Sequence, residues 1–208
     1  MLRMPTYRAL SGLLRFLLCL MLLGGALSTP LQGQAHLTNA GFEGEAQDAT
    51  VPLGWFPCQE GTTPDILPGF WGVYHEAAEG DTFLGLITRE DGTWESIGQR
   101  FSQPLQANEC YGFSLQLAHS PAYAGYSEPV VLRIWGGENR CGKTQLLLET
   151  EPIEEEEWRT HTLAFATKSK LHYILIEAFF PQTGQAVRGN VLIDALSPVE
   201  RCIRASLF

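Results

Sequence analysis

The sequence predicts an all-β protein, a sandwich of two antiparallel sheets preceded by a signal peptide. From Thr82 onward, strand-like segments of about six to nine residues alternate with turn residues such as Asp91-Gly92 and Cys141-Gly142. Short strands at this spacing are typical of sandwiches and barrels. No segment shows sustained helical periodicity, and alternating apolar side chains give several segments one buried face.

The first 28 residues have the organisation of a secretory signal peptide. Three arginines and no acidic residue accompany an apolar run from Phe16 to Leu27, and small residues precede the expected cleavage after Ser28. The run counts 12 residues, whereas a membrane-spanning helix needs ~20. We therefore expect no membrane span and a mature protein that is secreted, extracellular or periplasmic.

Charge and length limit the classes of partner. Removing residues 1–28 takes away three basic and no acidic residues, so the formal net charge falls from −9 to −12. Such a chain repels nucleic acid and anionic lipid, and we expect no nucleic-acid partner. The remaining length suits one domain, expected over residues 36–203.

Four cysteines remain after the leader, namely Cys58, Cys110, Cys141 and Cys202. An even number in an oxidising compartment predicts two disulfides, and none of the spacings is the close Cys-x-x-Cys of zinc sites. The residues alone leave the pairing open among the three possible connectivities.

The elements follow in chain order from a first strand at His36–Glu43. The stretch Gly54–Gly72 is irregular and rich in Pro and Gly, which indicates a binding loop or a loop folded back on the core. The further strands are predicted at Phe83–Thr88, Glu95–Phe101, Cys110–Ala118, Val130–Gly136, Thr144–Glu149, Trp158–Ala166, Leu171–Phe179 and Asn190–Pro198.

Alternation assigns a buried and an outer face to these strands, because side chains at i and i+2 share a side. The apolar rows predicted to face the core are Tyr111, Phe113, Leu115 and Leu117, then Val130, Leu132 and Ile134, then Ile174, Ile176 and Ala178. Three strands carry polar or aromatic residues on the opposite side, which are Ser96 and Arg100, Arg133 and Trp135, and Tyr173 and Glu177.

The sequence contains no recognisable catalytic set, and we expect no enzyme. There is no Gly-x-Ser-x-Gly motif and no cofactor motif. A hydrolase of unfamiliar type stays open, because two carboxylates that cleave glycosides need only lie ~5 to ~10 Å apart in space.

Two short signatures, Leu37-Thr38-Asn39-Ala40-Gly41-Phe42-Glu43 and Gly189-Asn190-Val191-Leu192-Ile193-Asp194-Ala195-Leu196, lie near the ends of the mature chain. This pairing resembles the jelly-roll carbohydrate-binding modules of the family-four, family-nine and family-twenty-two type, over about Leu37 to Cys202. The resemblance implies a jelly-roll β-sandwich in which the three outer rows share one concave, sugar-binding sheet. It also places the last strand beside the strand that Cys110 begins, and so favours the pairs Cys110–Cys202 and Cys58–Cys141.

The resemblance further implies a saccharide or glycan ligand and a structural calcium ion. Sugar rings stack on aromatic faces and their hydroxyls pair with charged groups, so the expected ligand-binding residues are Trp135, Arg133, Glu177, Tyr173 and Arg100, with Trp94 and Trp71 from loops. Glu43 and Asp194 match the carboxylate positions of the calcium site, and the entry to the third strand at Asp81 matches its third contributor.

A second hypothesis keeps the fold and the calcium ion but gives the chain a structural or adhesive role at a surface. In that case it binds a protein partner such as another cell-surface component. A contiguous apolar patch in place of a polar and aromatic groove would favour this hypothesis.

Overall fold

The computed structural model describes residues 34–181 and 185–202. The predicted signal peptide lies outside these residues. The compact unit that contains them runs from Gly33 to Phe208. Their regular structure consists of strands, as the sequence predicts: β1 (Phe56–Pro57), β2 (Asp65–Leu67), β3 (Phe83–Thr88), β4 (Ser96–Leu105), β5 (Cys110–Ala118), β6 (Glu128–Pro129), β7 (Val131–Gly137), β8 (Gln145–Glu149), β9 (Arg159–Ala166), β10 (Leu171–Phe179), β11 (Gly189–Asp194) and β12 (Glu200–Arg201).

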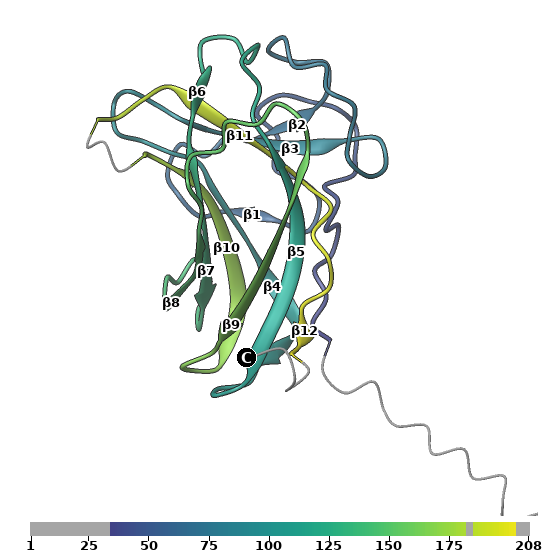
Figure 1. Ribbon diagram of the computed structural model, residues 1–208, viewed down its shortest axis with the longest axis vertical. Helices are drawn as coiled ribbons and strands as arrows, with labels where there is room; N and C mark the ends of the chain where they lie inside the picture. Colours follow the sequence, from purple (N-terminus) through teal and green to yellow (C-terminus); the bar gives the residue numbers. More distant parts are fainter. Residues whose placement is uncertain (1–33, 182–184, 203–208) are drawn as a thin grey trace, which may run out of the picture. The chain divides into compact units, whose positions relative to one another are not determined.

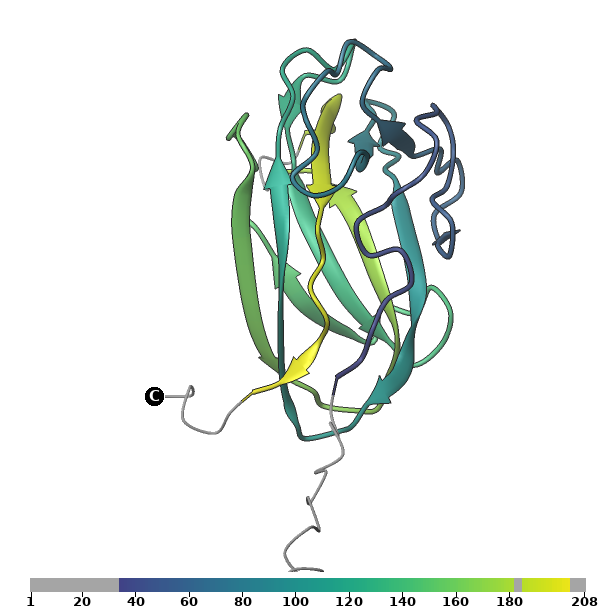
Figure 2. The ribbon, with the colours of Figure 1, turned by 90° about the vertical axis from the view of Figure 1, so that its right-hand side faces the viewer.

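The strands form two sheets (Figure 1, Figure 2). The five-stranded sheet has the order β1-β4-β10-β7-β8, and the seven-stranded sheet has the order β12-β5-β11-β3-β2, with β9 beside β5 and β6 beside β11. Neighbouring strands are antiparallel except for the short parallel pair β6 and β11. The predicted fold class, an antiparallel two-sheet β-sandwich, is confirmed.

The main core lies between the sheets and is built from the rows that alternation assigned to the interior. Leu115, Leu132 and Ile176 are at most 1% exposed and belong to one cluster. Burying such a side chain stabilises the fold by about 2 kcal/mol.

A second apolar cluster lies on the outer face of the seven-stranded sheet. Leu67, Val73, Phe83, Tyr123 and Leu192 are buried there by loops that fold back over the strands. The irregular stretch Gly54–Gly72 therefore folds back on the sandwich and contributes β1 to the five-stranded sheet and β2 to the seven-stranded sheet.

The predicted first strand at His36–Glu43 is wrong. An isolated bridge joins Ala35 to Val199 just before this segment, and within it single backbone hydrogen bonds reach His36 O from Ser102 N and Ala40 O from Leu196 N without forming a ladder. The backbone turns at Asn39 and Phe42, where φ is 51° and 55°. The Asn39 side chain accepts a hydrogen bond from Glu43 N at 2.7 Å and donates one to Glu43 O at 2.9 Å. These local bonds compete with a strand ladder, and the turn directs the fully buried Phe42 ring onto Trp55, 5.2 Å away.

The two ends of the domain lie side by side, as Figure 2 shows for the purple and yellow segments. β12 pairs with the start of β5, with Arg201 opposite Tyr111. Cys202 consequently faces Cys110, and disulfides join Cys110 to Cys202 and Cys58 to Cys141, the pairing that the resemblance implies. Closing loops of 92 and 83 residues contributes on the order of 4 kcal/mol each in the chain-entropy model.

Candidate functional site on the outer face of the five-stranded sheet

The three strands with polar outer rows are neighbours in one sheet. β10 lies between β4 and β7, so that Glu177 is opposite both Ser96 and Arg133. Tyr173, four residues earlier on the same face, is opposite Arg100. The sheet therefore brings five of the predicted ligand-binding residues, Arg100, Arg133, Trp135, Tyr173 and Glu177, onto one outer face.

Glu177 is the centre of this face and is fully buried. Its carboxylate accepts hydrogen bonds from the indole N–H of Trp135 at 2.8 Å and of Trp94 at 3.2 Å. Lys143 forms an ion pair with it at 2.5 Å. The two indoles come from different parts of the chain and are both partly exposed, so Glu177 orients two aromatic rings that remain open to solvent.

Lys143 is a residue of this face that the sequence did not indicate. It lies in the loop between β7 and β8, and its ammonium group is 5.3 Å from the Trp94 ring centre and 5.8 Å from that of Trp135. A cation near two indole rings is favourable, and here it also balances a buried anion. No sequence motif marks this position, because Glu177 and Trp94 are far away along the chain.

Arg133 is held by neighbours on the same face. Its Nε donates to Glu149 Oε2 at 2.6 Å, and its guanidinium carbon lies 3.6 Å from the Phe179 ring centre. The side chain is 21% exposed, so part of the guanidinium still reaches solvent.

The loop between β7 and β8 crosses this face and covers part of it. A Cβ on Gly137 would lie 2.4 Å from Gly142 O, which shows how closely the loop folds over the strand. Cys141 in this loop is bonded to Cys58, whose Sγ lies over β4, 3.0 Å from the position of a Cβ on Gly98. Leu175 on this face is only 1% exposed. The centre of the face is thus covered, and aromatic and charged groups lie around the covering loop.

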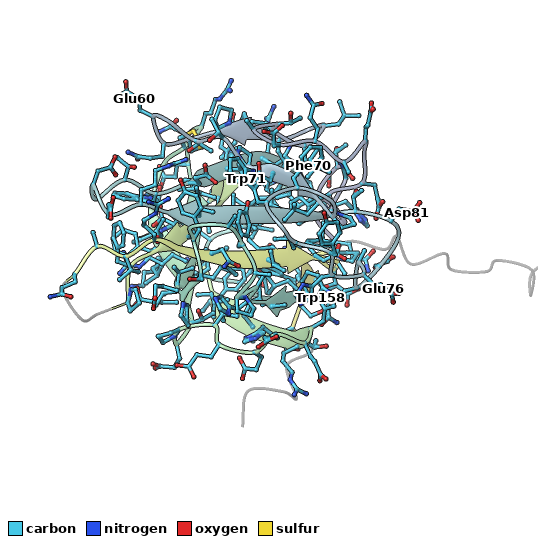
Figure 3. All side chains as sticks on the ribbon, turned by 90° about the horizontal axis from the view of Figure 1, so that it is seen from above. Glu60, Phe70, Trp71, Glu76, Asp81 and Trp158 are labelled. Atoms are coloured by element: carbon cyan, nitrogen blue, oxygen red, sulfur yellow. A yellow bond between two sulfur atoms is a disulfide. The ribbon has the colours of Figure 1, made fainter. Side chains whose placement is uncertain are left out.

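Trp71, the remaining predicted ligand-binding residue, lies elsewhere. Figure 3 shows Phe70 and Trp71 over the strands of the seven-stranded sheet. In the same region Asp65 accepts hydrogen bonds from the Tyr123 hydroxyl and from Ala49 N. Burial raises the pKa of the Asp65 carboxyl, and burial together with Asp65 raises the pKa of Tyr123.

The carboxylates expected to hold calcium lie next to each other. A Cβ on Gly41 would be 3.6 Å from Glu43 Oε1 and 3.8 Å from Asp194 Oδ1. Glu43 accepts hydrogen bonds from Asp81 N at 3.1 Å and Thr82 N at 3.3 Å. The Asp81 carboxylate itself is exposed, at the same edge as Glu76 in Figure 3.

These groups suit a cation. Burial raises the pKa of Asp194 to about 6, with a smaller contribution from the nearby Glu43 charge, although Glu79 N and Ala195 N donate hydrogen bonds to it. A calcium ion would offset that repulsion, and two carboxylates with backbone carbonyls are ligands it accepts. In residues 34–181 and 185–202 no cluster of three or more His, Cys, Asp or Glu side chains suited to a metal is found, so carbonyl oxygens would have to complete the set.

Comparison with known proteins identifies the fold. No protein-family model matches the chain, and no curated protein matches it. Among solved structures, the chain is similar to a Stig cyclase from Fischerella sp. TAU, with a TM-score of 0.54 and 15% identity over 82% of this chain and 98% of that one. It is also similar to the CBM22-1 xylan-binding domain of Paenibacillus barcinonensis Xyn10C, with a TM-score of 0.51 and 16% identity over 81% and 95% of the two chains.

A third similar structure is the K3 adhesin domain of Lys-gingipain from Porphyromonas gingivalis W83, with a TM-score of 0.50 and 14% identity over 80% of this chain and 99% of that one. At these identities the similarity shows the fold and not the activity. None of the described residues belongs to a helix long and apolar enough to cross a membrane. The chain has the jelly-roll β-sandwich fold of carbohydrate-binding modules, which certain adhesin domains and cyclases share.

Proposed function

We propose that the chain is a non-catalytic carbohydrate-binding domain whose ligand lies on the outer face of the five-stranded sheet. The observation that carries this proposal is the pair of partly exposed indoles, Trp94 and Trp135, oriented by one buried carboxylate. Sugar C–H groups stack on such rings, and a ring fixed by a hydrogen bond loses little rotational freedom on binding.

The fold supports the proposal, because a xylan-binding domain and an adhesin domain share it. The similar cyclases have the same fold, but this chain carries no Gly-x-Ser-x-Gly motif and no cofactor motif. We therefore assign binding and not chemistry to the face. Its two disulfides suit a protein exported to an oxidising compartment.

A structural calcium ion between Glu43 and Asp194 belongs to the proposal. These residues join the turn after the N-terminal segment to the end of β11. An ion held there would link the two ends of the domain, with Asp81 providing its backbone amide to orient Glu43. The role is structural, because the site lies on the other sheet from the proposed sugar-binding face.

Affinity gel electrophoresis with a panel of soluble polysaccharides, followed by a glycan array, tests the proposal. We expect retention of the wild type by at least one glycan and loss of retention in Trp135→Ala. Tyr74→Ala is the matched control, because Tyr74 is 77% exposed on the loop over the other sheet and its replacement should leave retention unchanged. If the wild type binds no glycan, or if Y74A loses binding as W135A does, the proposal is wrong.

A second candidate function, binding of a protein partner at a cell surface, is favoured by one specific observation. Trp71 and Tyr74 are 46% and 77% exposed on one loop, and that loop is held by a hydrogen bond from Gly69 N to Val73 O at 2.8 Å. Exposed aromatic residues on a rigid loop are typical of protein-binding surfaces. Loss of binding to whole cells in Trp71→Ala, with W135A unaffected, would favour this function over glycan binding.

A further inference from the structure

At one end of the same face, two arginines lie near an aromatic pair. Phe56 of β1 and Tyr173 of β10 pack edge to face, with ring centres 6.3 Å apart. Arg140 places its guanidinium carbon 4.2 Å from the Phe56 ring centre, and Arg100 is opposite Tyr173 across the β4–β10 ladder. Both rings are partly exposed and both arginines are exposed.

A glycine and a disulfide hold this arrangement in place. A Cβ on Gly98 would lie 2.8 Å from the Phe56 ring and 3.0 Å from Cys58 Sγ, so only glycine lets both lie flat on β4. The Cys58–Cys141 disulfide then holds the loop between β7 and β8 against this edge. Arg140 precedes Cys141 directly, which keeps its guanidinium over the Phe56 ring.

The charges of this cluster are unbalanced. The other two cations of the face are each paired, Arg133 with Glu149 and Lys143 with Glu177. In the part of the chain that the structure describes, no ion pair involves Arg100 or Arg140, and Glu138, two residues before Arg140, pairs with neither. Two uncompensated guanidinium groups are notable in a chain whose net charge is −9.

We infer that Arg100, Tyr173, Phe56 and Arg140 form a subsite for a saccharide that carries an anionic substituent, a carboxylate or a sulfate. Guanidinium groups recognise planar or tetrahedral oxyanions through paired, charge-assisted hydrogen bonds. Phe56 positions Arg140, and the partly exposed Tyr173 ring offers apolar surface to the sugar ring itself. This inference rests on the proposed saccharide-binding function and specifies the class of ligand.

Affinity electrophoresis and isothermal titration calorimetry with matched polymers test the inference. The first pair is polygalacturonate and its methyl ester, and the second is a sulfated galactan and the unsulfated galactan. We expect the wild type to bind one anionic polymer at least about tenfold more tightly than its neutral partner, and Arg100→Gln and Arg140→Gln each to lose about tenfold, the usual effect of one charge-assisted contact. The pair that shows the difference identifies carboxylate or sulfate.

Two controls separate this subsite from general electrostatic attraction. Arg159→Gln removes an exposed arginine from β9 of the other sheet and should leave affinity unchanged. Polyglutamate, an anionic polymer without sugar rings, should bind at least about tenfold more weakly than the preferred saccharide. Equal loss in R159Q, or equal binding of polyglutamate, overturns the inference.

The outcomes also separate this inference from the proposed function. If neutral polymers bind as tightly as anionic ones and W135A still abolishes binding, the subsite is wrong and the saccharide-binding function stands. If no polysaccharide binds, both are wrong.

Discussion

Lys143 and Glu177 should stabilise the fold as a unit, and a double-mutant cycle measures that coupling. The Glu177 carboxylate is fully buried, with an ion pair to Lys143 at 2.5 Å and hydrogen bonds from two indoles. Lys143→Met removes the only cation paired with it in the described residues while it keeps the apolar stem. A buried charge that loses its partner costs about 3 to 5 kcal/mol.

The expected cost of K143M is below that range, about 2 to 3 kcal/mol, for two reasons. The Lys143 side chain is 36% exposed, so water can reach the carboxylate in its place, and both indole N–H groups remain. Glu177→Gln should cost about 1 to 3 kcal/mol, because an amide accepts one indole hydrogen bond and leaves the other N–H unpaired. In the double variant no buried charge remains, so K143M should add little to the effect of E177Q.

Guanidinium chloride unfolding of the four proteins at pH 7 gives the coupling free energy, which we expect to be about 2 kcal/mol. The control pair is Glu157 and Arg159, which are 3.8 Å apart and largely exposed, and its coupling should be below about 0.5 kcal/mol. A coupling for Lys143 and Glu177 as small as that of the control pair would refute the reasoning, because the carboxylate would then be hydrated and not dependent on Lys143.

Three further predictions concern stability. Calcium at about 100 times its Kd should raise the Tm by about 5 to 10 °C over that of the protein in EDTA, as measured by differential scanning calorimetry. Asp194→Asn should remove this shift. Equal Tm values with and without calcium would contradict the proposed ion. Burial raises the pKa of Glu95, which disfavours its ionised form in the folded state. The free energy of unfolding should therefore fall as pH rises from about 4.5 through the raised pKa. In urea unfolding from pH 4.5 to 7.5 this fall should be smaller in Glu95→Gln, and an identical slope in both proteins would show that Glu95 does not contribute. Gly98→Val should cost about 1 to 3 kcal/mol of folding stability, because the valine side chain would collide with Phe56 and Cys58. The control Gly44→Ala, whose Cβ meets only Ile66 at 3.7 Å, should cost less than 1 kcal/mol. Similar losses for the two variants would contradict the close packing at Gly98.

Strand positions were predictable because their signal is local. The predicted strands Phe83–Thr88, Cys110–Ala118 and Leu171–Phe179 agree with β3, β5 and β10 residue for residue. Alternation of apolar side chains is a property of the strand itself, since each inward residue is buried by the same sheet-on-sheet packing. The first strand failed for an equally local reason, because Asn39 bonds its own turn.

The candidate site was predictable in part. The outer rows of three strands indicated Arg133, Trp135 and Glu177, and the sheet order β4-β10-β7 brings them together. What their side chains contact was not predictable, because Lys143 and Arg140 reach the face from a loop whose course depends on Cys58 and Cys141, 83 residues apart.

The sequence by itself determined the fold class and the strand faces, since the periodicity of apolar side chains acts residue by residue. Only the tertiary structure decided which loop covers the outer face and which cations there are paired. These are contacts between groups distant along the chain, and they follow from the packing of the whole sandwich and not from any local pattern.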